Sequence, residues 1–295
     1  MIDLHVHTTI SDGVLGPEEM VKKAGEFGLT AIGICDHDQV AAVEPAIREG
    51  KKYAIEVVPG TELSCYWTEN YRKEFHILGY YCDYKNRELL ERLTFFQNER
   101  EERAKKSLKT LENLGYRAEW KNILKIAKGA IGRPHITRTI LKNPQNKNLL
   151  LKTFGKVPEI GEFIEKYLIL GKPAYVEKAD FEPQEAIDLI HRLGGVAVLA
   201  HPGFDLTIGD KKTAAILKSW GLDGLEVLAP VKTPERTKKC FEYFSKVAQK
   251  NRFLATGGSD YHGIDGIGAG LGMLEWGFKI EEKYLIDLKN LWKGK

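Results

Sequence analysis

Long apolar runs are missing from this 295-residue sequence, and cysteines are few. No stretch approaches the roughly 20 consecutive apolar residues that a membrane-spanning helix needs. The chain opens on a strand-like segment and not on a signal peptide, so we expect a cytoplasmic protein without membrane association. The four cysteines form no CxxC pair and no zinc-ribbon spacing, which predicts reduced thiols.

Acidic residues are scarce in one part of the chain. Between Arg103 and Lys156 there are 14 Lys and Arg residues but two acids, Glu112 and Glu119, a local net charge of +12. Because the whole chain carries +3, the remainder carries −9. The basic segment is either a solvated helical face or a surface that attracts phosphates. No obligate protein partner is evident from the sequence.

Strands and helices alternate along most of the chain. Short apolar runs that end in polar loops predict seven strands, near residues 2–6, 31–35, 54–61, 74–80, 196–200, 223–228 and 253–257. Helices between successive runs favour a parallel sheet built from βαβ units. A seven-stranded α/β barrel is the simplest architecture, although an open sheet has the same local pattern.

The alternation stops between residues 85 and 180. Helical patterns there are interrupted by Gly115, by Asn143-Pro144 and by the Gly155–Pro158 region. We therefore predict a basic, mainly α-helical insertion domain at 85–180. The barrel domain is then discontinuous and comprises residues 1–84 and 181–295.

Histidines and carboxylates gather at the predicted strands and the loops that follow them. Six of the eight histidines occupy such positions: His5, His7, His37, His76, His201 and His262. In a parallel barrel the C-terminal strand ends meet on one face, where active sites lie. With Asp12, Glu62 and Asp260 they form a donor set that suits Mn²⁺, Zn²⁺ or Fe²⁺. Two or three ions about 3.5–4 Å apart would use such a set, with Glu62 as a bridging carboxylate.

Some residues in these regions have a simpler interpretation. His76, within a strand, can be a core histidine, and Asp36 and Asp38 can cap the helix that follows them. Glu226 lies in the middle of a predicted strand and can point into the barrel, but nothing in the sequence assigns it a role. His191 lies on a predicted helix and is expected at the surface.

The candidate residues lie in motifs that occur in this order: His5-Val-His7, Ser11-Asp12-Gly13, Cys35-Asp36-His37-Asp38, Gly60-Thr-Glu62, His76-Ile-Leu-Gly, Ala200-His201-Pro202 and Gly258-Ser-Asp260-Tyr-His262. Together they resemble the motifs of the PHP (polymerase and histidinol phosphatase) superfamily. Cys35 stands where Thr is common in that family, which should not affect the ligands. The resemblance implies a distorted seven-stranded (β/α)7 barrel that binds two or three divalent ions.

The resemblance also implies how the ligands are shared. His5, His7, Glu62 and Asp260 would hold one ion. Glu62, His76 and His201 would hold a second, and Asp12, His37 and His262 a third.

A further segment, Gly132-Arg133-Pro134-His135 in the insertion, resembles the subgroup of stand-alone nucleotide phosphatases. That subgroup includes nucleoside 3′,5′-bisphosphate phosphatases and 5′-to-3′ exoribonucleases acting on short RNA. The resemblance implies that Arg133 and His135 bind the substrate phosphate. A guanidinium can grip phosphate bidentately, and a helix start favours anions; the alternative for Arg133 is a structural salt bridge.

These observations predict a metal-dependent phosphoesterase. A metal-bound hydroxide would attack the phosphorus of a nucleotide or short oligonucleotide, and Asp260, His201 or His37 would transfer a proton. Tyr66, Trp67 and Phe204 beside the motif loops are either base-stacking or packing residues. Histidinol phosphate or another small phosphomonoester is an alternative substrate. A second alternative is a non-catalytic, metal-stabilised module that binds nucleic acid.

Overall fold

The computed structural model describes residues 1–67, 73–127, 129–177, 179, 181–209, 211–264 and 269–295. The chain divides into two compact units. We call the first, Met1–Glu91 with Asp180–Lys295, the barrel unit, and the second, Arg92–Ala179, the helical unit. Among the described helices, none is both long enough and apolar enough to cross a membrane.

The barrel unit is built on one seven-stranded sheet whose strands are neighbours in chain order. The strands are β1 (Ile2–Val6), β2 (Ala31–Ile34), β3 (Glu56–Trp67), β4 (Lys73–Tyr80), β5 (Val196–Leu199), β6 (Gly224–Leu228) and β7 (Leu254–Gly257). The sheet curls until its two edges meet, because Val6 pairs in parallel with Tyr261 just after β7. The backbone N–H of His7 donates to the carbonyl of Tyr261 across this seam at 2.9 Å. The predicted seven-stranded α/β barrel is confirmed.

The prediction of a fully parallel sheet is wrong for one strand. β4 runs antiparallel to both β3 and β5, whereas the other neighbouring strands pair in parallel. β3 extends to Trp67, beyond the expected end near residue 61, and β4 begins at Lys73. The few residues between them are too short for the crossover of a dozen or more residues that parallel strands need. Consequently β4 begins beside the C-terminal part of β3, and Ser64 pairs with His76.

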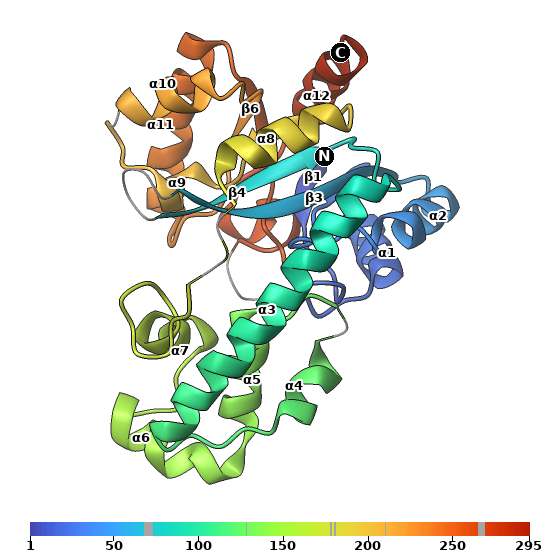
Figure 1. Ribbon diagram of the computed structural model, residues 1–295. Helices are drawn as coiled ribbons and strands as arrows, with labels where there is room; N and C mark the ends of the chain where they lie inside the picture. The colour runs from blue at the N-terminus through green and yellow to red at the C-terminus, as the bar shows by residue number, and fades with distance from the viewer. Residues whose placement is uncertain (68–72, 128, 178, 180, 210, 265–268) are drawn as a thin grey trace. The chain divides into compact units, whose positions relative to one another are not determined.

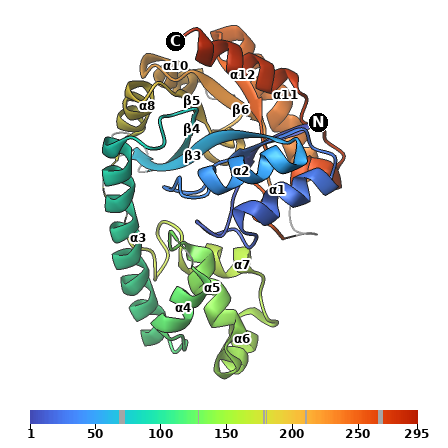
Figure 2. The ribbon, with the colours of Figure 1, turned by 90° about the vertical axis from the view of Figure 1, so that its right-hand side faces the viewer.

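Helices cover the outside of this sheet (Figures 1 and 2). They are α1 (Pro17–Glu26), α2 (Val43–Tyr53), α8 (Pro183–Arg192), α9 (Pro202–Asp205), α10 (Lys211–Ser219), α11 (Pro234–Asn251) and α12 (Lys283–Lys293), with the 3₁₀ helix η2 (Leu271–Trp276). All residues of β1 and β2 are buried, as expected for parallel strands whose two faces are covered. Gly33 cannot be replaced by a residue with a side chain, because a Cβ there would lie 2.1 Å from the carbonyl oxygen of Leu4.

The helical unit has a hydrophobic core of its own. Its helices are most of α3 (Arg87–Asn113), then α4 (Trp120–Ile126), α5 (Arg133–Lys142), the 3₁₀ helix η1 (Pro144–Asn146), α6 (Lys147–Phe154) and α7 (Ile160–Tyr167). Tyr116, Phe163 and Tyr167 pack their rings against one another in this core. Asn146 ties the loop before α4 to the end of α5, because its amide donates to the carbonyls of Arg117 and Ile140 at 2.8 Å each.

Candidate metal centre

His5 in β1 and His7 directly after it converge at the end of the barrel. His5 and His7 are two residues apart, so their side chains leave the same face. Both are fully buried, and their Nε2 atoms lie 3.1 Å apart. Around them the structure brings together all nine residues predicted as ligands, which we call the metal centre: His5, His7, Asp12, His37, Glu62, His76, His201, Asp260 and His262.

The first group of potential donor atoms comes from His5, His7, Glu62 and Asp260, whose atoms all lie within 4.8 Å of one another. Nε2 of His7 lies 3.0 Å from Oδ1 of Asp260 and 3.3 Å from Oε2 of Glu62. Nε2 of His5 lies 3.5 Å from the same Glu62 oxygen. One carboxylate oxygen therefore faces two imidazole nitrogens.

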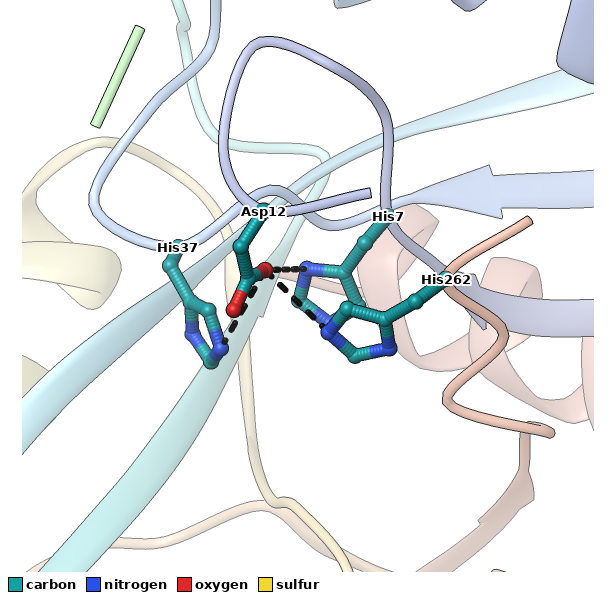
Figure 3. A group of neighbouring side chains, drawn as sticks. All are labelled: His7, Asp12, His37 and His262. Carbon is teal, nitrogen blue, oxygen red and sulfur yellow. Dashed lines mark ion pairs between the residues drawn. The ribbon is translucent and has the colours of Figure 1, made fainter. Parts of the chain in front are cut away.

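A second group comes from the loops after β1, β2 and β7 and comprises His7, Asp12, His37 and His262 (Figure 3). Its centre is Oδ1 of Asp12, which lies 3.1 Å from Nε2 of His262 and 3.9 Å from Nε2 of His37. Nδ1 of His7 is 4.0 Å away. Since the two ring nitrogens of His7 face different groups, His7 links the second group to the first.

The third group is organised by Glu62 at the end of the β2–β3 pair. His37 and Glu62 stand opposite each other there, and Nδ1 of His37 lies 2.7 Å from Oε2 of Glu62. The other oxygen, Oε1, lies 2.9 Å from Nδ1 of His76 and 3.0 Å from Nε2 of His201. The two oxygens of Glu62 thus face different sets of imidazoles, which is the geometry of a bridging carboxylate.

The donor set fits divalent cations. Nδ1 of His5 faces the Glu226 carboxylate at 3.1 Å, and Nδ1 of His262 lies 2.7 Å from the carbonyl oxygen of Asp260. A carboxylate or carbonyl partner requires an N–H on that nitrogen, so in a neutral ring the lone pair is on Nε2, which points into the groups described above. Buried Oε2 of Glu62 and Nδ1 of His37 make no hydrogen bond among the described residues, although they are close. A shared cation would satisfy these atoms.

The pKa values in this cluster differ because burial and neighbouring charge oppose each other. Burial acts against protonation of His5, but the Glu226 and Glu62 carboxylates outweigh it and raise the pKa of His5 to about 10. At His37 burial dominates and lowers the pKa to about 4. Burial alone would raise the pKa of Asp260, yet His262, His7 and His5 hold that pKa below its ordinary value. At neutral pH His37 is therefore a neutral ring and Asp260 an anion.

Sequence reasoning missed the role of Glu226, which lies in β6 and is fully buried. Besides facing His5, its carboxylate accepts a hydrogen bond from the backbone N–H of His201 at 2.7 Å. Gly258 packs against this pair, since a Cβ there would lie 2.2 Å from Cβ of His5 and 2.6 Å from Oε1 of Glu226. The sequence signal was a single acid within an apolar strand.

Two other carboxylates also support the centre without being predicted ligands. Asp36 accepts hydrogen bonds from the backbone and hydroxyl of Thr8 at 2.7 Å each and from the hydroxyl of Ser11, which lies 3.3 Å from Nδ1 of His7. Asp36 therefore anchors the loop after β1. Oδ2 of Asp205 lies 3.6 Å from Nδ1 of His201, one helical turn away.

The two residues predicted to bind phosphate lie at the start of α5, in the helical unit. The side chain of Arg133, the first residue of α5, is half-buried. His135 is buried, and its Nδ1 accepts a hydrogen bond from the backbone N–H of Gly132 at 3.0 Å. His135 therefore caps the helix. The one remaining histidine, His191, is half-buried, and its Nε2 lies 2.8 Å from Oδ2 of Asp223.

The three aromatic candidates for base stacking differ in exposure. Tyr66 and Trp67 are 5% and 3% exposed, and the ring of Trp67 packs against Trp220 and Phe75. Phe204 is 49% exposed, and its ring centroid lies 5.8 Å from that of His201. Exposure beside the metal centre favours Phe204 as the residue that contacts a ligand.

Known proteins resemble this chain over most of its length. The PHP domain model matches residues 3–192. The chain is 34% identical over 267 residues to the 5′-3′ exoribonuclease Rnm of Salmonella typhimurium, covering 88% of this chain and 84% of that protein. It is 27% identical to the 3′,5′-nucleoside bisphosphate phosphatase of Chromobacterium violaceum, covering 88% and 87% of the two chains.

A solved structure from Bifidobacterium adolescentis, of a protein proposed to be a metal-dependent phosphoesterase, has the same fold. Its TM-score is 0.79 at 24% identity, with 97% of this chain and 94% of that chain covered. The family model, the curated relatives and the cluster of nine potential donors together identify the chain as a metal-dependent phosphoesterase. The chain belongs to the PHP domain family, as its motifs predicted.

Proposed function

We propose that this enzyme hydrolyses phosphate esters of nucleotides, namely nucleoside 3′,5′-bisphosphates and short 5′-phosphorylated RNA, with two or three Mn²⁺, Zn²⁺ or Fe²⁺ ions in the metal centre. The observation that carries the proposal is the position of Glu62, whose two oxygens face different sets of imidazoles within 3.5 Å. Bridged ions are typical of enzymes that displace groups at phosphorus.

The names of the relatives support the substrate class. One relative is named a 5′-3′ exoribonuclease and another a 3′,5′-nucleoside bisphosphate phosphatase. Both kinds of substrate present a nucleotide with a phosphate ester on its ribose. Neither name points to histidinol phosphate or another small phosphomonoester, which remains the competing substrate class.

Different residues of the metal centre have different roles in the proposed reaction. When bound, the divalent ions supply Lewis acidity that activates a water molecule and neutralises phosphate charge. Asp260 is ionised at neutral pH because its pKa is lowered, and its side chain is 27% exposed, so it is a candidate for proton transfer, but the lowered pKa makes it a weak base. His37, with a pKa of about 4, is neutral at physiological pH and is a ligand or a proton acceptor. His201 is the remaining candidate for proton transfer to the leaving oxygen.

Two residues outside the centre bind the substrate in this proposal. Arg133 holds a phosphate of the substrate through its planar guanidinium, which can make two parallel hydrogen bonds to phosphate oxygens. His135 contributes by holding the start of α5 through its hydrogen bond with Gly132, and direct phosphate contact is the alternative role. Phe204 stacks on the base without selecting its identity.

The test compares three substrates with the metal-loaded enzyme: adenosine 3′,5′-bisphosphate, a 5′-phosphorylated five-nucleotide RNA and histidinol phosphate. We expect turnover of the first two and its loss when a chelator is added. Release of inorganic phosphate identifies phosphatase action, and release of nucleoside 5′-monophosphates identifies exonuclease action. Turnover of histidinol phosphate alone would overturn the nucleotide assignment.

A further inference from the structure

One stretch of the helical unit contains basic residues but no acidic residues. Residues 120–158 include nine Lys and Arg residues and not one Asp or Glu, although the whole chain has 41 acids among 295 residues. A solvated helical face usually mixes the two signs, as α3 does, where Lys105 pairs with Glu101 and Glu102 at 2.8 and 2.9 Å. A solvated helical face therefore does not account for the absence of acidic residues in this stretch.

Part of this stretch lines a groove of about 480 Å³ that lies within the helical unit. The groove is formed by α4, the C-terminal half of α5 and η1. It carries three cationic side chains, Lys125 from α4 with Arg138 and Lys142 from α5. Neutral hydrogen-bonding groups stand beside them, on Asn122, Thr139 and Gln145.

Lys125 and Lys142 are exposed and have no ion-pair partner in the part of the chain that the structure describes. Glu119, the one acid in the lining, lies 2.8 Å from Lys121, and the charge of Lys125 also contributes to lowering its pKa. Arg138 and Lys142 are four residues apart and share one helix face, an arrangement of like charges that destabilises an isolated helix. An anionic ligand would give the exposed Lys125 and Lys142 a partner of opposite charge.

We propose that this groove binds the phosphodiester backbone of single-stranded RNA. The proposal rests on the proposed function, in which the hydrolysed nucleotide occupies the metal centre and the rest of the oligonucleotide needs a separate surface. Cations with neutral donors suit backbone phosphates, whose binding is independent of sequence and weakens with salt. A nucleoside bisphosphate has no chain beyond the first nucleotide and does not use the groove.

The test uses the metal-loaded enzyme and the double variant Lys125→Gln/Lys142→Gln, with Lys147→Gln/Lys152→Gln on α6 as the matched control. The control removes two exposed lysines of the same unit that do not line the groove. Binding is measured by fluorescence anisotropy with a ten-nucleotide 5′-phosphorylated RNA whose phosphorothioate linkages slow hydrolysis. Each phosphate contact to a single strand contributes a slope of about −0.7 in log K against log salt, so two lost contacts weaken binding roughly 25-fold at about 0.1 M salt.

We expect that loss for the groove variant, a salt slope smaller by about 1.4, and little change for the control. The charge-retaining variant Lys125→Arg/Lys142→Arg should bind as the wild type does. Hydrolysis of adenosine 3′,5′-bisphosphate should be unchanged in all variants. Equal loss in the groove and control variants, or no binding of RNA by the wild type, would overturn the proposal. Failure of the proposed function would instead appear as absent hydrolysis of every nucleotide substrate by the wild type.

Discussion

The carboxylate of Glu226 lies 3.1 Å from Nδ1 of His5 and 2.7 Å from the backbone nitrogen of His201. One buried side chain from β6 therefore holds two residues of the metal centre that are about 200 positions apart in the chain. Since a carboxylate on the outer nitrogen of a ligand imidazole orients the ring and raises its basicity, Glu226 is expected to tune metal binding without touching the ion.

Replacing Glu226 by Gln should weaken metal binding by about 10- to 100-fold, the usual effect of removing such a partner. Gln keeps the shape of the side chain, so the fold should survive. Competition with a fluorescent chelator measures the affinity, and circular dichroism checks the fold. Unchanged affinity in a folded variant would show that Glu226 has a packing role only.

Replacing Glu62 by Gln should lower the number of bound ions. The carboxylate offers one oxygen to each set of imidazoles, whereas a carboxamide has only one oxygen that can bind a cation. We therefore expect at least one ion to be lost. We expect the rate of phosphoester hydrolysis to fall by at least about 100-fold, because a bridged site loses its clamp on the reacting oxygens. Elemental analysis after gel filtration gives the stoichiometry. His191→Gln, which alters a histidine outside the centre, is the control and should keep both stoichiometry and rate.

Metal binding should strengthen as pH rises from about 6 to 9. Without metal, the pKa of His5 is raised to about 10, so its ring is protonated at pH 7 and must release a proton to coordinate. The same raised pKa stabilises the metal-free fold below an unfolded pKa of about 6.5, and that contribution disappears as the pH rises through about 10. The increase in melting temperature on adding Mn²⁺ should therefore be larger at pH 9 than at pH 6. An increase that does not change with pH would contradict the protonated state of His5.

Replacing Phe204 by Ala should raise the KM for adenosine 3′,5′-bisphosphate by about 5- to 150-fold, since stacking on one base is worth about 1–3 kcal/mol. The KM for ribose 3,5-bisphosphate, which has no base, should change little. Phe27→Ala, another partly exposed phenylalanine of the barrel unit, serves as the control. An equal rise for both substrates would assign Phe204 to the support of His201.

Replacing Arg133 by Ala should lower kcat/KM for 5′-phosphorylated substrates by about 100-fold, and Lys should restore little, because an ammonium cannot reproduce the bidentate geometry. The exposed Arg236 of α11 provides the control, as Arg236→Ala. The alternative, a structural salt bridge, predicts a lower melting temperature with an unchanged KM. Measuring both quantities separates the two roles.

Some features of the site were accessible from the sequence because they are local. Each motif follows or lies in an apolar run that forms a strand, so the spacing of His5 and His7, or the position of His201 after β5, already placed these residues at strand ends. The predicted direction of β4 was wrong, because the local sequence pattern of a strand does not determine whether it pairs parallel or antiparallel. The strand at 74–80 has the same composition whether it runs parallel or antiparallel, and the extension of β3 to Trp67 left too short a link for a parallel crossover before β4.

The sequence by itself determined the donor set, the seven strands and the family, because these depend on residue types and on periodicities of a few residues. Only the tertiary structure decided which atoms face one another. Curling of the sheet brings His7 to Asp260 at 3.0 Å and places Glu62 between two sets of imidazoles. It also turns Glu226 inward against His5. Those relationships join strands far apart in the chain, and no local pattern records them.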